Sequence, residues 1–370
     1  MSQNKTNFAV PLAFVGMMFF AIGFALGINS FLIPVLKGAL SLPSGVAYLL
    51  LAATFVPFLI FGYPASATIA KIGYKRTMAL SFLIFAVAFI LFVLSAKLEN
   101  FILFLIASFV SGAANAYLQA SVNPYITILG PIESAAKRMS IMGICNKLVA
   151  DQTNVQTSDL YLPFYIIIGV FLLLGIISLM APLPEVKAAG EDESDTANCP
   201  YAANKTSIWQ FPHLVLGALT LFIYVGVETL SLSTAVDYAK ALNLENPDLY
   251  AWIPSIGMVI GYICGIILIP QYLTQDMAMR ICACIGVAGS LAIVLLPAEI
   301  SIWAIFLMAL GCSLMWPALW PLAMADLGKF TKSGSALLTM AIAGGAVIPT
   351  VFGFLQEGLG AQAAYWLALP

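Results

Sequence analysis

The stretch FILFLIASFVSGAANAYLQASVNPYITIL, residues 101–129, contains no charged side chain. A helix that crosses the hydrocarbon core of a bilayer needs about 20 mainly apolar residues, so this stretch is long enough to span a membrane. Nine further runs of the same kind lie along the chain, at residues 8–36, 45–70, 77–96, 162–181, 211–236, 251–271, 279–297, 301–325 and 335–356. The pattern predicts an all-α integral membrane protein.

Two other segments begin as membrane helices and do not continue. Residues 139–150 are apolar but pass directly into DQTNVQTSD (151–159), and about a dozen residues are too few to cross. The chain closes on AAYWLALP (363–370), which again resembles the first turns of a helix. We therefore expect an abbreviated helix at 139–150 and a final helix that is largely missing.

The composition agrees with a protein whose solvent is lipid. Hydrophobic residues make up 62% of the 370 residues and charged residues only 9%, against about 25% charged in soluble proteins. The net charge of -2 excludes a basic surface for nucleic acid. Neither a Walker lysine motif nor a metalloprotease or serine-hydrolase motif occurs, so we predict no enzyme, no cofactor and no metal site.

One long polar interval, PLPEVKAAGEDESDTANCPYAANKTS (182–207), divides the chain. Its acidic cluster and prolines are typical of a solvated linker. It predicts two helix bundles, residues 1–181 and 208–370, joined by that linker. If the helices alternate in direction, most of the Lys and Arg residues fall on the side of the linker, which indicates that the linker and the N-terminus are cytoplasmic.

Three carboxamides, Asn115, Gln119 and Asn123, recur at intervals of four and form one stripe on a helix. In a bilayer such side chains face the bundle interior or a watery cavity. Interhelical hydrogen bonding would explain one or two of them, whereas three in register favour a lining that faces a substrate. Amides both donate and accept, which suits a ligand covered in hydroxyl groups.

An ionisable residue, Glu228, lies deep in the span at 211–236, one turn after Tyr224. A carboxyl group at that depth is a candidate functional group, with Tyr224 as the side chain that orients it. A permanently protonated, structural glutamic acid is the alternative. Trp316 and Trp320 offer indole rings for stacking on a sugar, although tryptophan also anchors helices at the membrane interface.

The chain resembles the fucose/glucose–galactose porter family of the major facilitator superfamily. The resemblance covers nearly the whole chain and is carried by GINSFLIPVLK (27–37), IGYKR (72–76), NPYITILGP (123–131), LFIYVGVET (221–229) and LGKFTKSGSALLTMAIAGGAVIP (327–349). It implies two six-helix bundles that import a monosaccharide of the glucose, galactose or fucose class by alternating access, with a proton or sodium ion as the coupling cation.

The resemblance also implies site residues and departures from the family pattern. Ser30 and Gln119 stand where the proton-coupled fucose branch has acids, and Asn146 matches a sugar-binding asparagine of the fifth helix. Three alternatives follow: Glu228, with Tyr224, takes the coupling proton, or sodium is the coupling ion, or the sugar moves down its gradient without an ion. In the sodium alternative, Ser30, Asn29 and Thr229 supply oxygen ligands. Asn29 is also a candidate sugar-binding residue. Gln119→Ala and Asn146→Ala are each expected to reduce uptake strongly.

The expected protein is a monomer in the bacterial cytoplasmic membrane. The alternatives to a cation-coupled monosaccharide importer are an N-acetylhexosamine transporter, an uncoupled sugar uniporter, a polyspecific exporter and a sugar sensor that does not transport.

Overall fold

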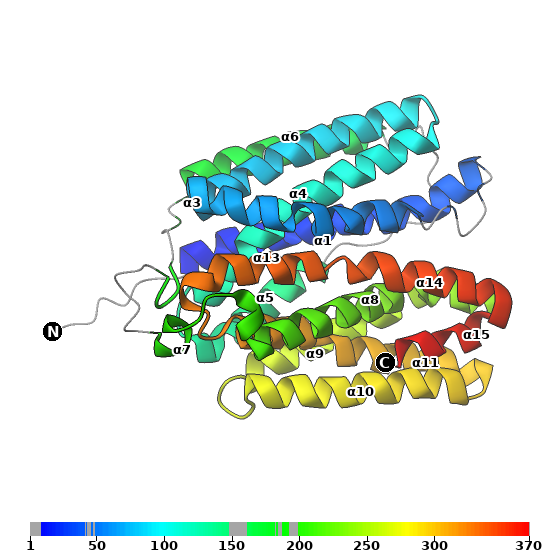
Figure 1. The fold of residues 1–370 in the computed structure, drawn as a ribbon. Coiled ribbons are helices and arrows are strands. Elements are labelled where there is room, and N and C mark those ends of the chain that lie inside the picture. The colour runs from blue at the N-terminus through cyan, green and yellow to red at the C-terminus, as the bar shows by residue number, and fades with distance from the viewer. Residues whose placement is uncertain are drawn as a thin grey trace.

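The computed structural model describes residues 9–40, 42, 46, 49–147, 161–181, 183, 187–191 and 199–369. All regular structure in these ranges is helical (Figure 1). Before the linker lie α1 (Ala9–Leu40), α3 (Leu49–Lys97), α4 (Phe101–Ile128), η1 (Ile132–Ser134), α5 (Ala135–Lys147) and α6 (Tyr161–Met180). These helices are called the first half below.

The second half follows the short linker helix α7 (Pro200–Ala203). Its elements are η4 (Ile208–Gln210), α8 (Pro212–Ala241), η5 (Pro247–Ala251), α9 (Trp252–Leu268), α10 (Gln275–Leu295), α11 (Ala298–Ser313), α12 (Met315–Met324), η6 (Gly328–Phe330), α13 (Thr331–Ala341), α14 (Gly344–Leu359), α15 (Ala361–Ala364) and η7 (Tyr365–Ala368). The long helices of both halves run along one common direction, and α7 lies at the same end as the start of α1 (Figure 1). We call this the linker end.

The apolar runs predict the membrane segments well. Within the described ranges, nine helices or helix pairs are long and apolar enough to cross a membrane. The expected runs 45–70 and 77–96 both belong to α3, which is interrupted at Gly73, where φ is 81°. This break lies within the IGYKR motif, and a positive φ such as this one is readily adopted only by glycine.

The two incomplete segments also have the expected character. The helix expected at 139–150 is α5, which begins earlier, at Ala135, and ends at Lys147, while residues 148–160 lie outside the described part of the chain. Residues 361–368 form only the short α15 and η7. The ring of Tyr365 is fully buried there, and its hydroxyl lies 2.7 Å from Oγ1 of Thr234 in α8.

Close packing of α3 on α4 depends on Gly112. A Cβ atom added at Gly112 would lie 2.1 Å from the carbonyl oxygen of Thr54, and a backbone atom cannot rotate away. Membrane helices that approach so closely need small residues at the contact. We expect Gly112→Ala to lower the free energy of unfolding by about 1–3 kcal/mol through overpacking.

Thermal unfolding of the detergent-purified protein measures this effect. Gly169→Ala in α6 is the matched control, because a Cβ atom there would have no neighbour within 4 Å. Equal melting temperatures for the two variants would contradict the close approach of α3 and α4.

Candidate functional site

A cavity of about 190 Å³ lies between the two halves. Both halves contribute to its wall, the first through α1, α3, α4 and α5 and the second mainly through α8, α9 and α12. Its lining residues are Phe19, Ile22, Gly23, Leu26, Gly27, Leu51, Phe55, Gln119, Met139, Gly143, Val225, Glu228, Thr229, Leu232, Ala251, Ser255, Tyr262, Trp316 and Ile342. The wall is thus mostly apolar with a few polar groups, as in most small-ligand sites.

Of the amide stripe, only Gln119 lines the cavity. Asn115 and Asn123, one turn to either side, have an exposed fraction of 0%. Neither the oxygen nor the nitrogen of their amides has a hydrogen-bond partner among the described residues. The stripe is therefore a real feature of α4, but in this conformation a single member meets the cavity.

Glu228 is placed in the cavity wall by α8. The hydroxyl of Tyr224 donates a hydrogen bond to Oε2 of Glu228 at 2.6 Å, as one helical turn of separation allows. The predicted pairing of the two side chains thus has the expected geometry. Among the described lining residues, Glu228 is the only carboxylate.

The two tryptophans of α12 have different surroundings. Trp316 lines the cavity, whereas Trp320 is fully buried and its indole N–H has no partner among the described residues. Their ring centroids are 5.6 Å apart and the rings are inclined at 49°. At this inclination the two rings do not form one flat surface, and only Trp316 lines the cavity.

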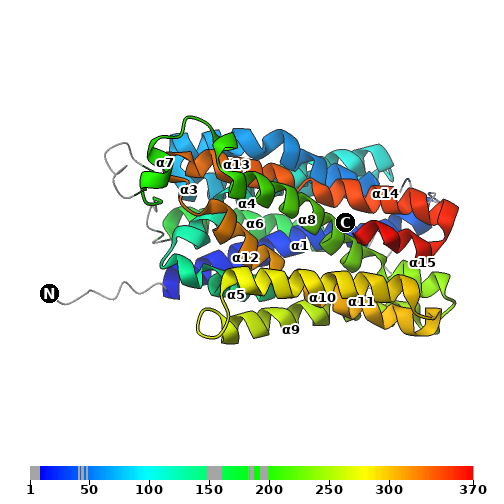
Figure 2. The ribbon, with the colours of Figure 1, turned by 60° about the horizontal axis from the view of Figure 1, so that its bottom comes forward.

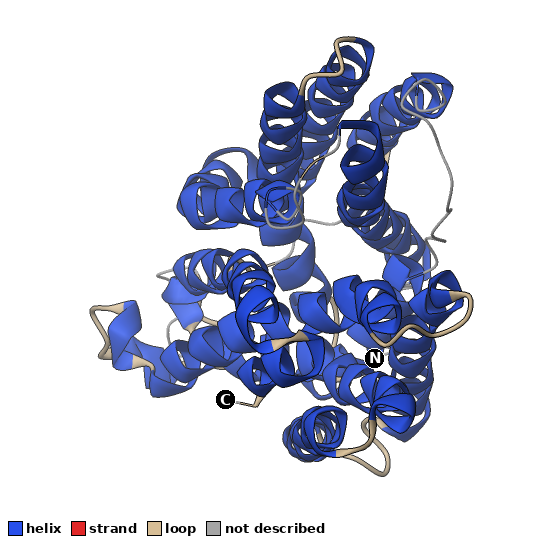
Figure 3. Ribbon diagram, turned by 90° about the vertical axis from the view of Figure 1, so that its right-hand side faces the viewer, coloured by secondary structure: helices blue, strands red, loops and turns tan. Residues whose placement is uncertain are grey.

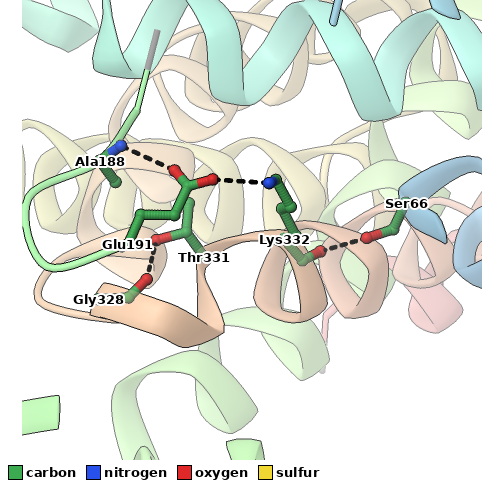
Figure 4. Close-up of polar contacts among 6 residues, drawn as sticks. All are labelled: Ser66, Ala188, Glu191, Gly328, Thr331 and Lys332. Carbon is green, nitrogen blue, oxygen red and sulfur yellow. Dashed lines mark hydrogen bonds and ion pairs between the residues drawn. The ribbon is translucent and has the colours of Figure 1, made fainter. Parts of the chain in front are cut away.

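The linker end is sealed by hydrogen bonds between the halves. Ser66 of α3 donates to the carbonyl of Lys332 in α13 at 2.7 Å (Figure 4), and Gln275 of α10 donates to the carbonyl of Ile132 at 2.6 Å. Ser335 of α13 approaches the carbonyl of Ala120 at 3.4 Å. Pro124 leaves that carbonyl without its helical donor, because proline has no N–H.

The linker itself takes part in this seal. The carboxylate of Glu191, 6% exposed, lies 2.9 Å from Nζ of Lys332 and accepts a hydrogen bond from the backbone N–H of Ala188 at 2.8 Å (Figure 4). Lys332 therefore contacts the linker through its side chain and the first half through its backbone. The cavity lining, by contrast, reaches Ala251 and Leu51 toward the opposite end, from which Figure 3 views the helices.

Comparison with known proteins identifies the architecture. The family model described as Major Facilitator Superfamily matches residues 14–350. The chain belongs to this superfamily. A major facilitator transporter, FucP, solved in the outward conformation, superimposes with a TM-score of 0.80 at 22% identity, over 98% of this chain and 96% of that one. A double-tryptophan mutant of XylE gives 0.73 at 14% identity, over 97% and 92%.

Two named relatives align with nearly the whole length of this chain. A glucose/galactose transporter of Brucella abortus (biovar 1, strain 9-941) is 28% identical over 100% of this chain and 93% of the relative. An L-fucose-proton symporter of Escherichia coli (strain K12) is 23% identical over 96% and 89%. The resemblance to the fucose/glucose–galactose porters is confirmed. So is the prediction of a membrane transporter rather than an enzyme, because these relatives and the superfamily are transporters.

The sequence analysis did not predict the contact of α5 with α9 beside the cavity between the two halves. α5 lies against α1 and α9 (Figure 2), and a Cβ atom at Gly143 would lie 2.6 Å from the ring of Tyr262. The phenol of Tyr262 thus occupies the place of a side chain at residue 143. Of the glycines 257, 261 and 265, spaced by four on α9, the first two face α11, and only Gly265 approaches α5, where an added Cβ atom would lie 2.8 Å from Oγ of Ser140.

Three predicted site residues lie outside the described side chains. Asn29 and Ser30 are in α1, and Asn146 is near the end of α5. Their roles stay predictions.

Proposed function

We propose that this protein is a secondary transporter that imports a monosaccharide of the glucose, galactose or fucose class together with a proton. The observation that supports it best is the cavity between the halves, which brings the amide of Gln119, the indole of Trp316 and the carboxyl of Glu228 into one wall. The relatives named as glucose/galactose transporters and fucose-proton symporters give the substrate class.

The chemistry of the wall suits a sugar. The amide of Gln119 can donate to one hydroxyl and accept from another. Trp316 offers an apolar ring face for the C–H side of a pyranose, and its N–H adds a donor. Because the remaining wall is largely apolar, each polar contact made by the ligand is formed in a site of low dielectric constant and gains strength.

Glu228 is the proposed proton carrier. The fucose branch of the resemblance has acids at the positions of Ser30 and Gln119, and both positions are neutral here. Among the described lining residues, Glu228 is the carboxylate that a proton can reach from the cavity. The hydrogen bond from Tyr224 holds it in position. The carboxyl group is charged without a proton and neutral with one. Because this difference in charge favours different conformations, the two halves are expected to move only when Glu228 is protonated.

Alternating access would move residues 1–181 against residues 208–370. We place the linker end in the cytoplasm, because Lys71, Lys75, Arg280, Lys329 and Lys332 all lie at that end of their helices. With that orientation, the contacts described above close the cytoplasmic side, and we propose that this arrangement corresponds to an outward-facing state. The proposed protein is a monomer in the bacterial inner membrane.

Uptake into proteoliposomes tests this function. Labelled D-glucose, D-galactose, L-fucose and N-acetylglucosamine are offered with an inward proton gradient, with an inward sodium gradient, and with neither. We expect the proton gradient alone to drive accumulation of one of the first three sugars. With one proton per sugar, a gradient of one pH unit sustains about tenfold accumulation.

The other outcomes identify the alternatives. A sodium requirement would reassign coupling to oxygen ligands such as Ser30 and Asn29. Equilibration without accumulation indicates a uniporter, and a preference for N-acetylglucosamine indicates a hexosamine transporter. Binding without counterflow would contradict transport and indicate a sensor, while competition by lipophilic cations rather than sugars indicates an exporter.

A further inference from the structure

Two side chains just beneath the cavity have polar atoms without partners. Asn123 of α4 and Trp320 of α12 both have an exposed fraction of 0%. The amide oxygen and nitrogen of Asn123, and the indole nitrogen of Trp320, make no hydrogen bond to any described residue. A buried donor or acceptor left unpaired loses its hydration without compensation, so this arrangement costs free energy in the present state.

These two residues occupy equivalent positions in the two halves. Each is four residues along its helix from a cavity residue, Asn123 from Gln119 and Trp320 from Trp316. Both helices run toward the linker end, α4 ending at Ile128 just before η1 and α12 ending at Met324 just before η6. Four residues of helix advance about 6 Å. Asn123 and Trp320 therefore lie one turn deeper than the cavity, on opposite sides of the boundary between the halves.

Helices of the second half contact α4 close to this level. α12 packs against α4, and α13 crosses α4 at Ala120, where Ser335 approaches the carbonyl oxygen. Below them, Ser66 and Lys332 join α3 to α13. Opening the linker end requires these contacts between halves to separate. We expect the same separation to uncover the Asn123 amide and the Trp320 indole.

A structural role in interhelical hydrogen bonding does not account for Asn123. An amide with that role would have a hydrogen-bond partner on a neighbouring helix, and no described residue is a partner of Asn123. We infer that Asn123 and Trp320 form an inner sugar subsite, which binds the sugar only after the transporter has opened toward the linker end. The inference rests on the proposed sugar transport and divides its site in two. Gln119 and Trp316 bind the sugar that arrives, and Asn123 and Trp320 bind it before release.

Sugar-for-sugar exchange, measured separately at the two faces, tests the subsite. Right-side-out and inside-out membrane vesicles give the half-saturating sugar concentration at the outer and the cytoplasmic face, with D-glucose, D-galactose and L-fucose as probes. We expect Asn123→Ala and Trp320→Phe each to raise the cytoplasmic value about three- to tenfold, the effect of losing one or two hydrogen bonds. The outer value should be unchanged or slightly lower, because each substitution removes an unpaired polar group from the outward-facing state.

The variants are matched to separate this role from a structural one. Trp320→Phe keeps an aromatic ring and removes the N–H, so it tests the donor even if Asn123→Ala folds poorly. Ser121→Ala is the control on α4, since its hydroxyl is already bonded to the carbonyl of Tyr117 at 2.8 Å, and both of its values should match the wild type. Equal changes at the two faces, or none at the cytoplasmic face, would overturn the subsite. Wild-type vesicles that exchange none of the three sugars would refute the proposed function, and the subsite with it.

Discussion

Replacing Gln119 by alanine is expected to reduce sugar uptake at low sugar concentration by about 10- to 100-fold. The amide is the one member of the α4 stripe that lines the cavity, and it is only 3% exposed. A sugar bound there exchanges its hydration for the two hydrogen bonds that the amide offers. Loss of both leaves sugar hydroxyl groups unpaired in an apolar wall, at a cost of about one factor of ten for each.

Initial rates of uptake in proteoliposomes, taken well below half-saturation, measure this effect. Equal amounts of inserted protein must be confirmed for the variant and the wild type. Gln119→Glu provides a graded comparison, because a carboxylate still accepts hydrogen bonds but no longer donates, and it should retain more uptake than alanine. A Gln119→Ala protein that takes up sugar as fast as the wild type would remove this residue from the site.

Replacing Glu228 by glutamine is expected to abolish accumulation driven by a proton gradient and to leave sugar-for-sugar exchange intact. Glutamine has nearly the shape of protonated glutamic acid, so the variant resembles the loaded carrier and can still move between its two states. It cannot release a proton, and the gradient therefore has no group on which to act. Tyr224 can still donate its hydrogen bond to the amide oxygen, which preserves the local structure.

The two activities are measured on the same proteoliposomes. Accumulation is followed with an imposed proton gradient, and exchange is followed with equal sugar on both sides and no gradient. Tyr224→Phe is a useful companion, because it removes the donor that lies 2.6 Å from Glu228 and keeps the carboxyl group. It should weaken coupling without abolishing it. Persistent proton-driven accumulation in Glu228→Gln would show that another group carries the proton.

The membrane segments could be predicted because each is defined by its own composition. A run such as residues 211–236 is apolar enough to partition from water into lipid regardless of its neighbours, and α8 lies there. The break at Gly73 falls between two separate apolar runs, 45–70 and 77–96, so an interruption there was also visible locally. Glu228 and Tyr224 could be paired from their spacing alone, because four residues make about one turn.

The contact between the halves could not be predicted in the same way. Gly143 and Tyr262 are far apart in the chain, and no local pattern of either shows that the ring of one fills the side-chain space of the other. The same holds for Ser66 and Lys332, whose hydrogen bond seals the linker end. Such contacts depend on how the two halves of the chain meet.

Sequence alone determined that this protein is a bundle of membrane helices, with Asn115, Gln119 and Asn123 on one face of the fourth. That much follows from the transfer of side chains into lipid and from helical periodicity, which are both local properties. Tertiary structure alone decided that Gln119 meets the cavity while Asn123 and Trp320 are covered. The physical reason is that exposure depends on the opposing half, whose helices α12 and α13 contact α4.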